Sequence, residues 1–409
     1  KSARIENKTK GKRFADDILG SLLLILILIV TVVEIFTPYL VFIIAPGFVE
    51  NSIKFNLAVE LTRITFPFLI FISLSSFFSG ILNSNNKFAA AAAAPIILNI
   101  ILILSLIISY KLNLNFANQL SYGVTLAGVL QLVFLFFVTF KFYKPTLTLK
   151  LKANNKVKNF FKKLIPSIFS SGVTQINILI GTIIASYEAG AVSYLYYADR
   201  IYQINLAIAG IAVGTVSLPA LSKAFKNRNI KKLSNIQNKS FELSLLLSIP
   251  ASLGLILASE EIVNSLFGYG SFSKKDVKLT ADALKYFGYG VPAFALVKIL
   301  SNFFMVIINI SISVSLFASF GFIIIPIATS ISTWTGVLIY IYLLNEKNSL
   351  LLNKKLIPNF IKILASTIIM SIIMVLLINN YESYLNYSYK FKAIYLLSIV
   401  GFVGIVYLL

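Results

Sequence analysis

Cysteine and histidine are both absent from this 409-residue sequence, and acidic residues are few. Without cysteine there can be no disulfide and no thiolate nucleophile, and without histidine the commonest general base and metal ligand is missing. Only 12% of the residues are charged, against about 25% in an ordinary soluble domain. The composition therefore excludes an ordinary soluble enzyme, and its high apolar content also excludes a disordered chain.

Apolar residues and positive charge dominate instead. Hydrophobic residues make up 58% of the chain, and the mean hydropathy is +0.86. Lys and Arg number 36 against 15 Asp and Glu, which gives a net charge of +21. In a soluble protein this charge would suggest a nucleic-acid partner. In so apolar a chain it indicates basic loops on one side of a membrane.

Long apolar runs predict membrane-spanning helices, because a span needs about 20 mostly apolar residues. The runs are continuous and lack the two-residue alternation of barrel strands. The candidate spans lie at residues 18–45, 61–83, 88–110, 119–140, 164–186, 191–217, 241–258, 283–304, 305–317, 323–344, 360–379 and 391–409. The sequence therefore predicts an all-α integral membrane protein with about twelve spans.

The charges between the runs predict the topology. If segment 1–17 faces the cytoplasm and the sides then alternate, the cytoplasmic segments carry 25 Lys and Arg and the opposite segments carry 8. This is a strong positive-inside pattern. The basic tract 141–163 is accordingly interpreted as a cytoplasmic linker. The last three cations, Arg63, Arg200 and Lys298, lie inside apolar runs.

One stretch has too few loops. Residues 286–344 must cross about three times, yet Lys298 is their only charge, and two runs meet near Met305 without a loop. A segment starting at Pro67 resembles one starting at Pro292, but the second copy is 15 residues shorter. We therefore expect a loop to be missing near Met305. The abrupt charged start suggests that earlier helices are missing too.

Charges at membrane depth are costly and usually face a cavity or a partner. The clearest case is SYLYYADRIYQ, in which Ser193, Tyr196, Asp199, Arg200 and Gln203 fall along one face of a helix. The favoured interpretation is a cavity-lining face on which Arg200 grips an anion such as phosphate in bidentate geometry. The alternative is a structural ion pair, either within this helix or with another.

Two further charged positions favour structural interpretations. Arg63 follows Glu60 by three residues, so the two can pair along a helix near its outer end. Glu34 precedes Pro38 near the outer end of the first run, and we interpret it as a solvated acid at the membrane interface. These positions are weaker candidates for a binding site than Arg200.

Other polar residues leave both interpretations open. Lys298 could line a cavity or pair between helices, and so could the amides of GVTQIN, Gln175 and Asn177. No run holds paired carboxylates, and no glycine motif of the phosphate-cradling type occurs. A transporter driven by an ion gradient or by membrane potential is therefore favoured over an enzyme.

Several sequence segments resemble those of one known family. They are LTRITFPFLIFISLSSFFSGILNSNNKFAAAAAAPIILNI (Leu61–Ile100), the segment Pro166–Phe225, APGF (Ala45–Phe48) and FGYGSF (Phe267–Phe272). They closely resemble the MurJ/MviN type of lipid II flippase, within the multidrug/oligosaccharidyl-lipid/polysaccharide exporter superfamily. The resemblance covers nearly the whole chain, and YLYYADR followed by a GxxxGT–LP segment is its most specific motif.

The resemblance implies a fold of fourteen helices. Two six-helix lobes would enclose a central cavity, and a final helix pair would form a groove for the lipid tail. The twelve runs would match the third through fourteenth helices. The implied parts are an N-terminal lobe at 1–150, a C-terminal lobe at 151–345 and the helix pair at 346–409.

The resemblance also implies a function that is not enzymatic. The chain would move lipid II, the lipid-linked peptidoglycan precursor, from the cytoplasmic to the outer leaflet by alternating access, in support of cell-wall biogenesis and cell shape. Arg200 matches an arginine thought to bind the diphosphate, Asp199 matches its acidic neighbour, and Gln203 stands where some relatives have Glu. The expected substrate-binding residues are Arg200, Asp199, Gln203, Tyr196, Asn177 and Arg63.

Some relatives hold a sodium ion in the second lobe, and the resemblance locates the corresponding residues here. Asn309 and Thr329 look like members of that site, but Gly181 and Ser313 stand where relatives have acids. Hard cations prefer carboxylate oxygens. We therefore expect no metal and no other cofactor.

The expected location is the bacterial cytoplasmic membrane, and the expected state is a monomer. The expected partners are lipid II and membrane lipids, with cell-wall synthesis proteins as candidates and no nucleic acid. The alternatives are a flippase for another lipid-linked oligosaccharide, a drug or cation antiporter of the same superfamily, and an integral-membrane glycan-processing enzyme. An antiporter should carry deep acids, whereas the deep charges here are mainly basic.

Overall fold

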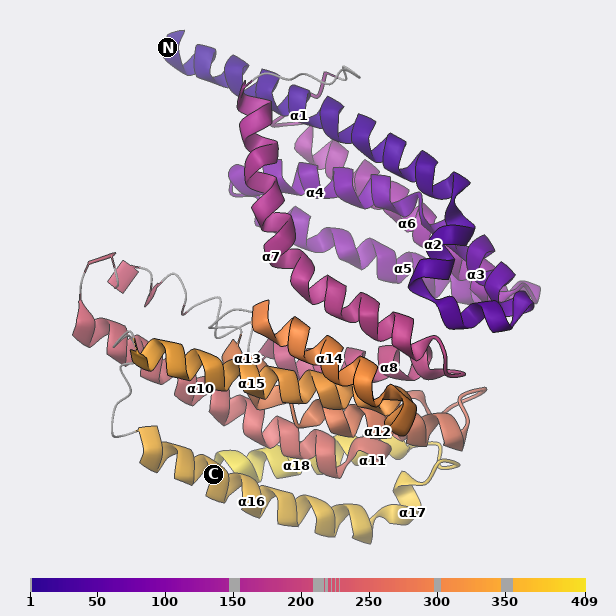
Figure 1. Ribbon diagram of the computed structural model, residues 1–409, viewed down its shortest axis with the longest axis vertical. Helices are drawn as coiled ribbons and strands as arrows, with labels where there is room; N and C mark the ends of the chain where they lie inside the picture. Colours follow the sequence, from indigo (N-terminus) through magenta and orange to yellow (C-terminus); the bar gives the residue numbers. More distant parts are fainter. Residues whose placement is uncertain are drawn as a thin grey trace. The chain divides into compact units, whose positions relative to one another are not determined.

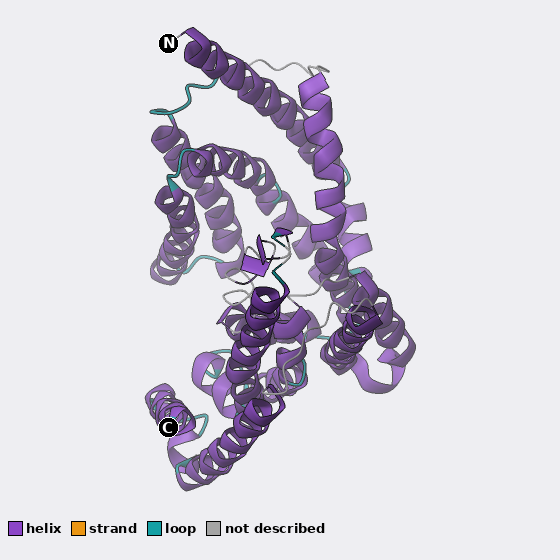
Figure 2. Cartoon of the chain, turned by 90° about the vertical axis from the view of Figure 1, so that its left-hand side faces the viewer, coloured by secondary structure: helices purple, strands orange, loops and turns teal. Residues whose placement is uncertain are grey.

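The computed structural model describes residues 2–146, 155–208, 217, 220–221, 223–224, 226–227, 229–297, 303–346 and 356–409. Throughout these residues every regular element is a helix and no strand occurs (Figure 2). The predicted all-α class is therefore confirmed. The chain divides into two compact units, residues 1–171 and 172–409.

The first unit is built from helices that pack around α4 and α6 (Figure 1). Gly128 of α6 allows a close approach to α4, because a Cβ atom there would lie 2.6 Å from the ring of Phe68. Leu74, Phe78 and Leu135 are buried in the resulting core. The elements are α1 (Ser2–Ile35), α2 (Thr37–Ile44), η1 (Pro46–Glu50), α3 (Ser52–Thr65), α4 (Phe68–Ser84), α5 (Phe88–Leu112), α6 (Phe116–Thr139) and the start of α7 (Asn155–Ala185).

Two of the predicted runs are each divided near a proline, which lacks the N–H that a continuous helix requires. The run 18–45 is interrupted at Phe36, and Pro38 lies in the first turn of α2. The run 61–83 joins the end of α3 to α4 across Pro67. Hydropathy alone does not show these breaks, because the sequence stays apolar through both.

The second unit contains the remaining helices. Its core is formed by apolar residues of α7, α8, α12 and α15 and includes Ile201, Leu284 and Ile324. The elements are the end of α7, α8 (Ala191–Leu206), α10 (Ile230–Leu257), α11 (Ser259–Phe267), α12 (Lys274–Gly288), α13 (Val291–Val297), α14 (Phe303–Phe320), η3 (Gly321–Ile323), α15 (Ile324–Glu346), α16 (Leu356–Asn380), α17 (Glu382–Leu385) and α18 (Lys392–Leu408).

The prediction of one helix over residues 283–304 is wrong. Within this range α12 ends at Gly288 and α13 begins at Val291, so the helix is broken at Tyr289–Gly290. The chain is helical again from Phe303, which includes the backbone of Met305. Lys298 and the stretch beside the expected missing loop lie at residues 298–302, outside the described residues.

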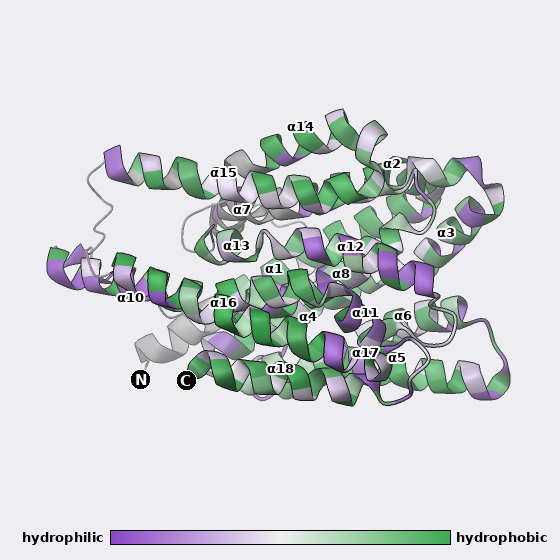
Figure 3. Ribbon diagram, turned by 90° about the horizontal axis from the view of Figure 1, so that it is seen from below, coloured by the Kyte–Doolittle hydropathy of each residue, from purple (hydrophilic) through white to green (hydrophobic). Residues whose placement is uncertain are grey.

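Long apolar helices make this a multi-pass membrane protein. In Figure 3 hydrophobic residues cover most of α16 and α18, whereas hydrophilic residues gather at the start of α10. Two shorter apolar helices are Gln175–Ala185 and Lys392–Leu408. Among the described residues, seven helical stretches are long and apolar enough to span a membrane: Gly11–Ile35, Ser52–Ser84, Phe88–Leu112, Phe116–Thr139, Ile230–Leu257, Val306–Leu343 and Leu356–Asn380.

A buried lysine at the start of α18 attaches this last helix to the end of α11 and to the turn before α18. Lys392 is fully buried, and its Nζ donates to Asn264 Oδ1 (3.0 Å), to the carbonyl oxygen of Gly268 (2.7 Å) and to that of Tyr387 (2.8 Å). The ammonium also lies 4.2 Å from the ring centroid of Tyr269. All three N–H groups are used, so the charge is held by oxygen dipoles and an aromatic face.

Candidate functional site

Helix α8 is fixed at its start by a turn and by a bond to α12. Gly190 precedes the helix with φ +80°, and a Cβ atom there would lie 2.7 Å from the ring of Tyr194. The hydroxyl of Tyr194 donates to Asp276 Oδ1 at 2.7 Å. Asp276 in turn forms a capping box with Ser273 at the start of α12. Its side-chain and backbone hydrogen bonds with Ser273, and the bond from Tyr194, lower the pKa of Asp276.

The buried face of α8 sets the direction of its polar face. Ala198, Ile201 and Tyr202 are buried. The ring of Tyr202 stacks on Phe287 with centroids 5.3 Å apart, and it meets the ring of Phe294 edge-on at 5.2 Å. The opposite side of the helix is exposed, and it carries Ser193, Tyr196, Arg200 and Gln203.

Asp199 and Arg200 interact electrostatically, but their close contacts are with different residues. Gln203 Nε2 donates to Asp199 Oδ2, while the guanidinium of Arg200 lies over the Tyr196 ring, 4.6 Å from its centroid. Among the described residues no carboxylate lies within salt-bridge distance of Arg200. The alternative of a direct Asp199–Arg200 ion pair is therefore not what the structure shows. Arg200 keeps an exposed charge whose donors can bind a planar or tetrahedral anion.

The amides of α7 and the charges of the first unit lie apart from this helix in the sequence. Gln175 is exposed and Asn177 is half-buried on α7, and the side chain of Thr174 is outside the described residues. In the first unit Asn118 Nδ2 donates to Glu60 Oε1 at 3.4 Å. Arg63 is exposed and interacts electrostatically with Glu34. The described contacts of Glu60 and Arg63 therefore do not include the expected pair along α3.

The residues of the expected sodium-like cluster bind one another. Asn309 Nδ2 donates to Thr329 Oγ1 (2.8 Å), and Ser313 Oγ donates to Asn309 Oδ1 (3.0 Å). All three side chains are buried. A Cβ atom on Gly181 would lie 3.3 Å from Ile325 Cγ2, so apolar atoms occupy that side. The described residues hold no group of three or more His, Cys, Asp or Glu that could bind a metal. This neutral, mutually bonded set does not fit a metal ion, because hard cations prefer carboxylate oxygens.

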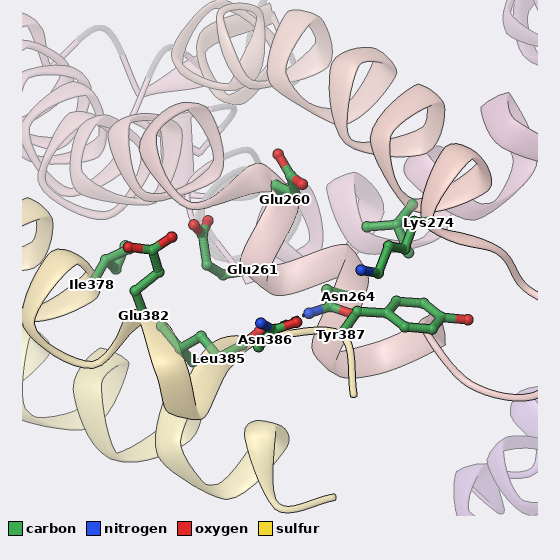
Figure 4. Close-up of a pocket in the computed structure, with 10 residues that line it drawn as sticks. Glu260, Glu261, Asn264, Lys274, Ile378, Glu382, Leu385, Asn386 and Tyr387 are labelled. Carbon is green, nitrogen blue, oxygen red and sulfur yellow. Dashed lines mark hydrogen bonds between the residues drawn. The ribbon is translucent and has the colours of Figure 1, made fainter. Parts of the chain in front are cut away.

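A separate cavity of about 320 Å³ lies where α11 and α12 meet the turn after α16 (Figure 4). Glu260, Glu261 and Glu382 surround one part of it, and Lys274 lies near Tyr387 at another. Burial raises the pKa of the Glu261 carboxyl, and the neighbouring charges of Glu260 and Glu382 add to the shift. None of these residues belongs to α8, so the cavity is not the predicted site.

Sequence reasoning missed two features of the second unit. It did not predict that Lys392, at the start of the predicted span 391–409, is buried with polar partners, and it predicted continuous helix across the α12–α13 break. Gly288, Gly290 and Pro292 were a signal for the break, since glycines beside a proline favour a turn. No local signal marked Lys392, because its partner Asn264 is 128 residues away.

A protein whose described elements are all helical, with several apolar spans and an arginine on the exposed side of one helix, is a multi-pass membrane transporter by class. A family model described as lipid II flippase MurJ matches residues 1–396. A probable lipid II flippase MurJ of Rickettsia prowazekii (strain Madrid E) is 36% identical over 98% of this chain and 82% of its own length. The chain belongs to the MurJ family of lipid II flippases. Membership of this family confirms the expectation of a transporter rather than an enzyme.

Solved structures support the same fold. A structure titled lipid II flippase MurJ, inward closed conformation, superposes with a TM-score of 0.79 at 24% identity, covering 100% of this chain and 86% of that one. A multidrug resistance MATE family transporter of the MOP superfamily superposes with a TM-score of 0.61 at 14% identity, covering 83% of this chain and 87% of that one. At these identities the structures show the shared architecture alone.

Proposed function

We propose that this chain moves lipid II from the cytoplasmic to the outer leaflet of the bacterial cytoplasmic membrane by alternating access. Family membership supports the transport reaction. The observation that carries the site is Arg200, which lies on the exposed face of α8 with its guanidinium over the Tyr196 ring and interacts with the neighbouring Asp199 only electrostatically. A cation at membrane depth needs a water-filled cavity or an anionic ligand, and lipid II supplies a diphosphate.

The contacts around Arg200 suit it to a diphosphate. Tyr196 supports one face of the guanidinium, which leaves the in-plane N–H groups free for phosphate oxygens. Gln203 donates a hydrogen bond to the Asp199 carboxylate. This carboxylate therefore competes less with phosphate oxygens for the Arg200 guanidinium. Tyr196 and Gln203 therefore act as positioning residues for Arg200.

The polyprenyl tail stays in lipid during transport, along the C-terminal helices α16 and α18. The head group enters from the cytoplasmic side, where 25 of the 36 cations are expected, and it is released outside. A positively charged carrier that has released its anionic cargo is drawn back by an inside-negative potential. Lipid II and the surrounding lipids are the partners of this proposal, and the carrier acts as a monomer.

The test is rescue of cells depleted of their own lipid II flippase by expression of the full-length protein. We expect growth, rod or coccal shape and lipid II export to return. Export is measured by the accessibility of lipid II to a probe added outside the cells. Correct membrane insertion with no export would overturn the proposed function.

We further propose that transport needs no bound sodium, because the Asn309–Ser313–Thr329 cluster is neutral and internally bonded. Replacing sodium by choline at constant ionic strength should leave the initial rate of lipid II transport in proteoliposomes within about twofold. Collapsing the membrane potential under the same conditions should slow it. A rate that falls to background in choline and returns with sodium would contradict this proposal.

A further inference from the structure

The cavity beside α11 and α12 lies where two membrane-spanning helices end. The apolar spans Ile230–Leu257 and Leu356–Asn380 belong to α10 and α16, which pack against each other. The charged lining begins just beyond both ends, with Glu260 and Glu261 after the first span and Glu382 after the second. The cavity therefore lies at the level where lipid head groups meet water, on the side that the positive-inside pattern predicts to be the outer one.

Hydrogen bonds between distant segments hold the walls of this cavity together. Asn264 of α11 donates from Nδ2 to the Leu385 carbonyl at 2.7 Å, and its Oδ1 accepts from Lys392 at 3.0 Å. The Tyr387 hydroxyl donates to the Phe272 carbonyl, which joins the segment after α17 to the loop before α12. The cavity is therefore a built feature of the second unit.

The buried part of the lining is apolar and the exposed part is charged. Val277, Ile378 and Leu385 are buried, whereas Glu260 and Glu382 are exposed. The volume of about 320 Å³ is far larger than the roughly 10–15 Å³ that a single water needs. The cavity therefore has room for a polar group of several atoms that is attached to an apolar part.

The carboxylates of the lining gather without a cation between them. Glu260, Glu261 and Glu382 surround one part of the cavity (Figure 4). Burial raises the pKa of Glu261, and the neighbouring charges that raise it further are those of the other two carboxylates. The described residues hold no group of three or more acids that could bind a metal ion. An organic ammonium suits this arrangement, because it is larger than a metal ion and donates several charge-assisted hydrogen bonds.

The opposite part of the lining is cationic. Lys274, at the start of α12, is exposed, and its Nζ lies 5.9 Å from the ring centroid of Tyr387. Figure 4 shows Lys274 across the cavity from the three carboxylates. A ligand that matches both parts carries a positive and a negative group a short distance apart.

We propose that this cavity binds the head group of phosphatidylethanolamine, a phospholipid with a primary ammonium and a phosphate. The ammonium lies among the carboxylates of Glu260, Glu261 and Glu382, and the phosphate lies beside Lys274. The glycerol and the upper part of the acyl chains cover the buried apolar lining, so the tails enter the bilayer beside α16. This site includes no residue of α8, so the inference is independent of the proposed function.

The test compares three phospholipids on the full-length protein in detergent. Native mass spectrometry measures the dissociation constants of phosphatidylethanolamine, phosphatidylcholine and phosphatidylglycerol with identical acyl chains. We expect phosphatidylethanolamine to bind roughly tenfold tighter than the other two. Choline has no N–H donor for the carboxylates, and phosphatidylglycerol has no cation. Soluble glycerophosphoethanolamine should bind much more weakly, because it lacks the acyl chains that contact apolar surface.

Three variants assign this binding to the cavity. Glu261→Gln combined with Glu382→Gln keeps the shape of the lining but removes two charges, so the preference over phosphatidylcholine should fall to within about twofold. The change removes carboxylates that repel each other, so the variant should fold as stably as the wild type. Lys274→Gln should weaken phosphatidylethanolamine roughly fivefold. Glu50→Gln is the matched control, an exposed acid of the first unit, and should bind all three lipids like the wild type.

Equal binding of the three lipids by the wild type would overturn this inference, and so would a preference that survives in the double variant. Glycerophosphoethanolamine that binds as tightly as the lipid would assign the cavity to a soluble zwitterion instead. Magnesium ions that displace phosphatidylethanolamine from the wild type would make it a divalent-cation site. None of these measurements depends on lipid II, so each result leaves the rescue test of the proposed function unaffected.

Discussion

Arg200→Ala should reduce lipid II transport by roughly 100-fold or more, which is the largest effect we expect from a single substitution. Charge-assisted hydrogen bonds contribute about 1.5–3 kcal/mol each, and a bidentate contact to phosphate makes two. Arg200 is the only cationic residue of α8, so no other residue of this helix can replace the lost positive charge. The measurement is the initial rate of lipid II translocation in proteoliposomes at equal protein content.

Two variants show whether the effect belongs to the guanidinium. Arg200→Lys keeps the charge but loses the planar fork and should retain an intermediate rate. Lys231→Ala removes an exposed cation at the start of α10 and should transport like the wild type. Because Arg200 is exposed, its loss should leave the thermal midpoint of the detergent-solubilised protein nearly unchanged. Wild-type transport by Arg200→Ala would remove this residue from the site.

The polar face of α8 could be predicted because it depends on local spacing. Positions 193, 196, 200 and 203 follow the helical period, and the structure exposes all four on one side. The partners of these residues were less predictable. Asp199 could bond Arg200 or Gln203 with equal ease from the sequence, and only the side-chain arrangement selects Gln203.

The interruptions in the helices were harder to predict, because hydropathy measures burial and does not report backbone continuity. The run around Tyr289 stays apolar on both sides of the turn, so a hydropathy window reads one span. The glycines at 288 and 290 permit a break but do not require one. What stabilises it is a set of donors on α10 and α15, and these contacts join residues 36–45 positions apart.

Lys392 shows the same limit for a single residue. From the sequence it is one of a few outer-side cations at the start of the last apolar run. In the structure it is fully buried, and its partners Asn264 and Gly268 are more than 120 residues away. Asn264 bridges the two segments, because its Nδ2 also donates to the Leu385 carbonyl at 2.7 Å.

Lys392→Met should destabilise the second unit more than any surface substitution. The methionine fills most of the same space but leaves Asn264 Oδ1 and two carbonyl oxygens buried without donors, at about 1–3 kcal/mol for each. Removal of the buried ammonium offsets part of this, so we expect a net loss of about 3 kcal/mol. The apparent thermal midpoint in detergent should fall by roughly 5–10 °C.

Lys390→Met is the matched control, because Lys390 lies two residues earlier and is exposed, and its midpoint should stay within about 1 °C of the wild type. Asn264→Leu removes the side chain that accepts one of the hydrogen bonds of Lys392. The double variant with Lys392→Met should therefore be less destabilised than the sum of the two single changes. Additive losses would mean that the two residues act separately. If Lys392→Met unfolded at the same temperature as Lys390→Met, the buried ammonium would contribute nothing to the attachment of α18.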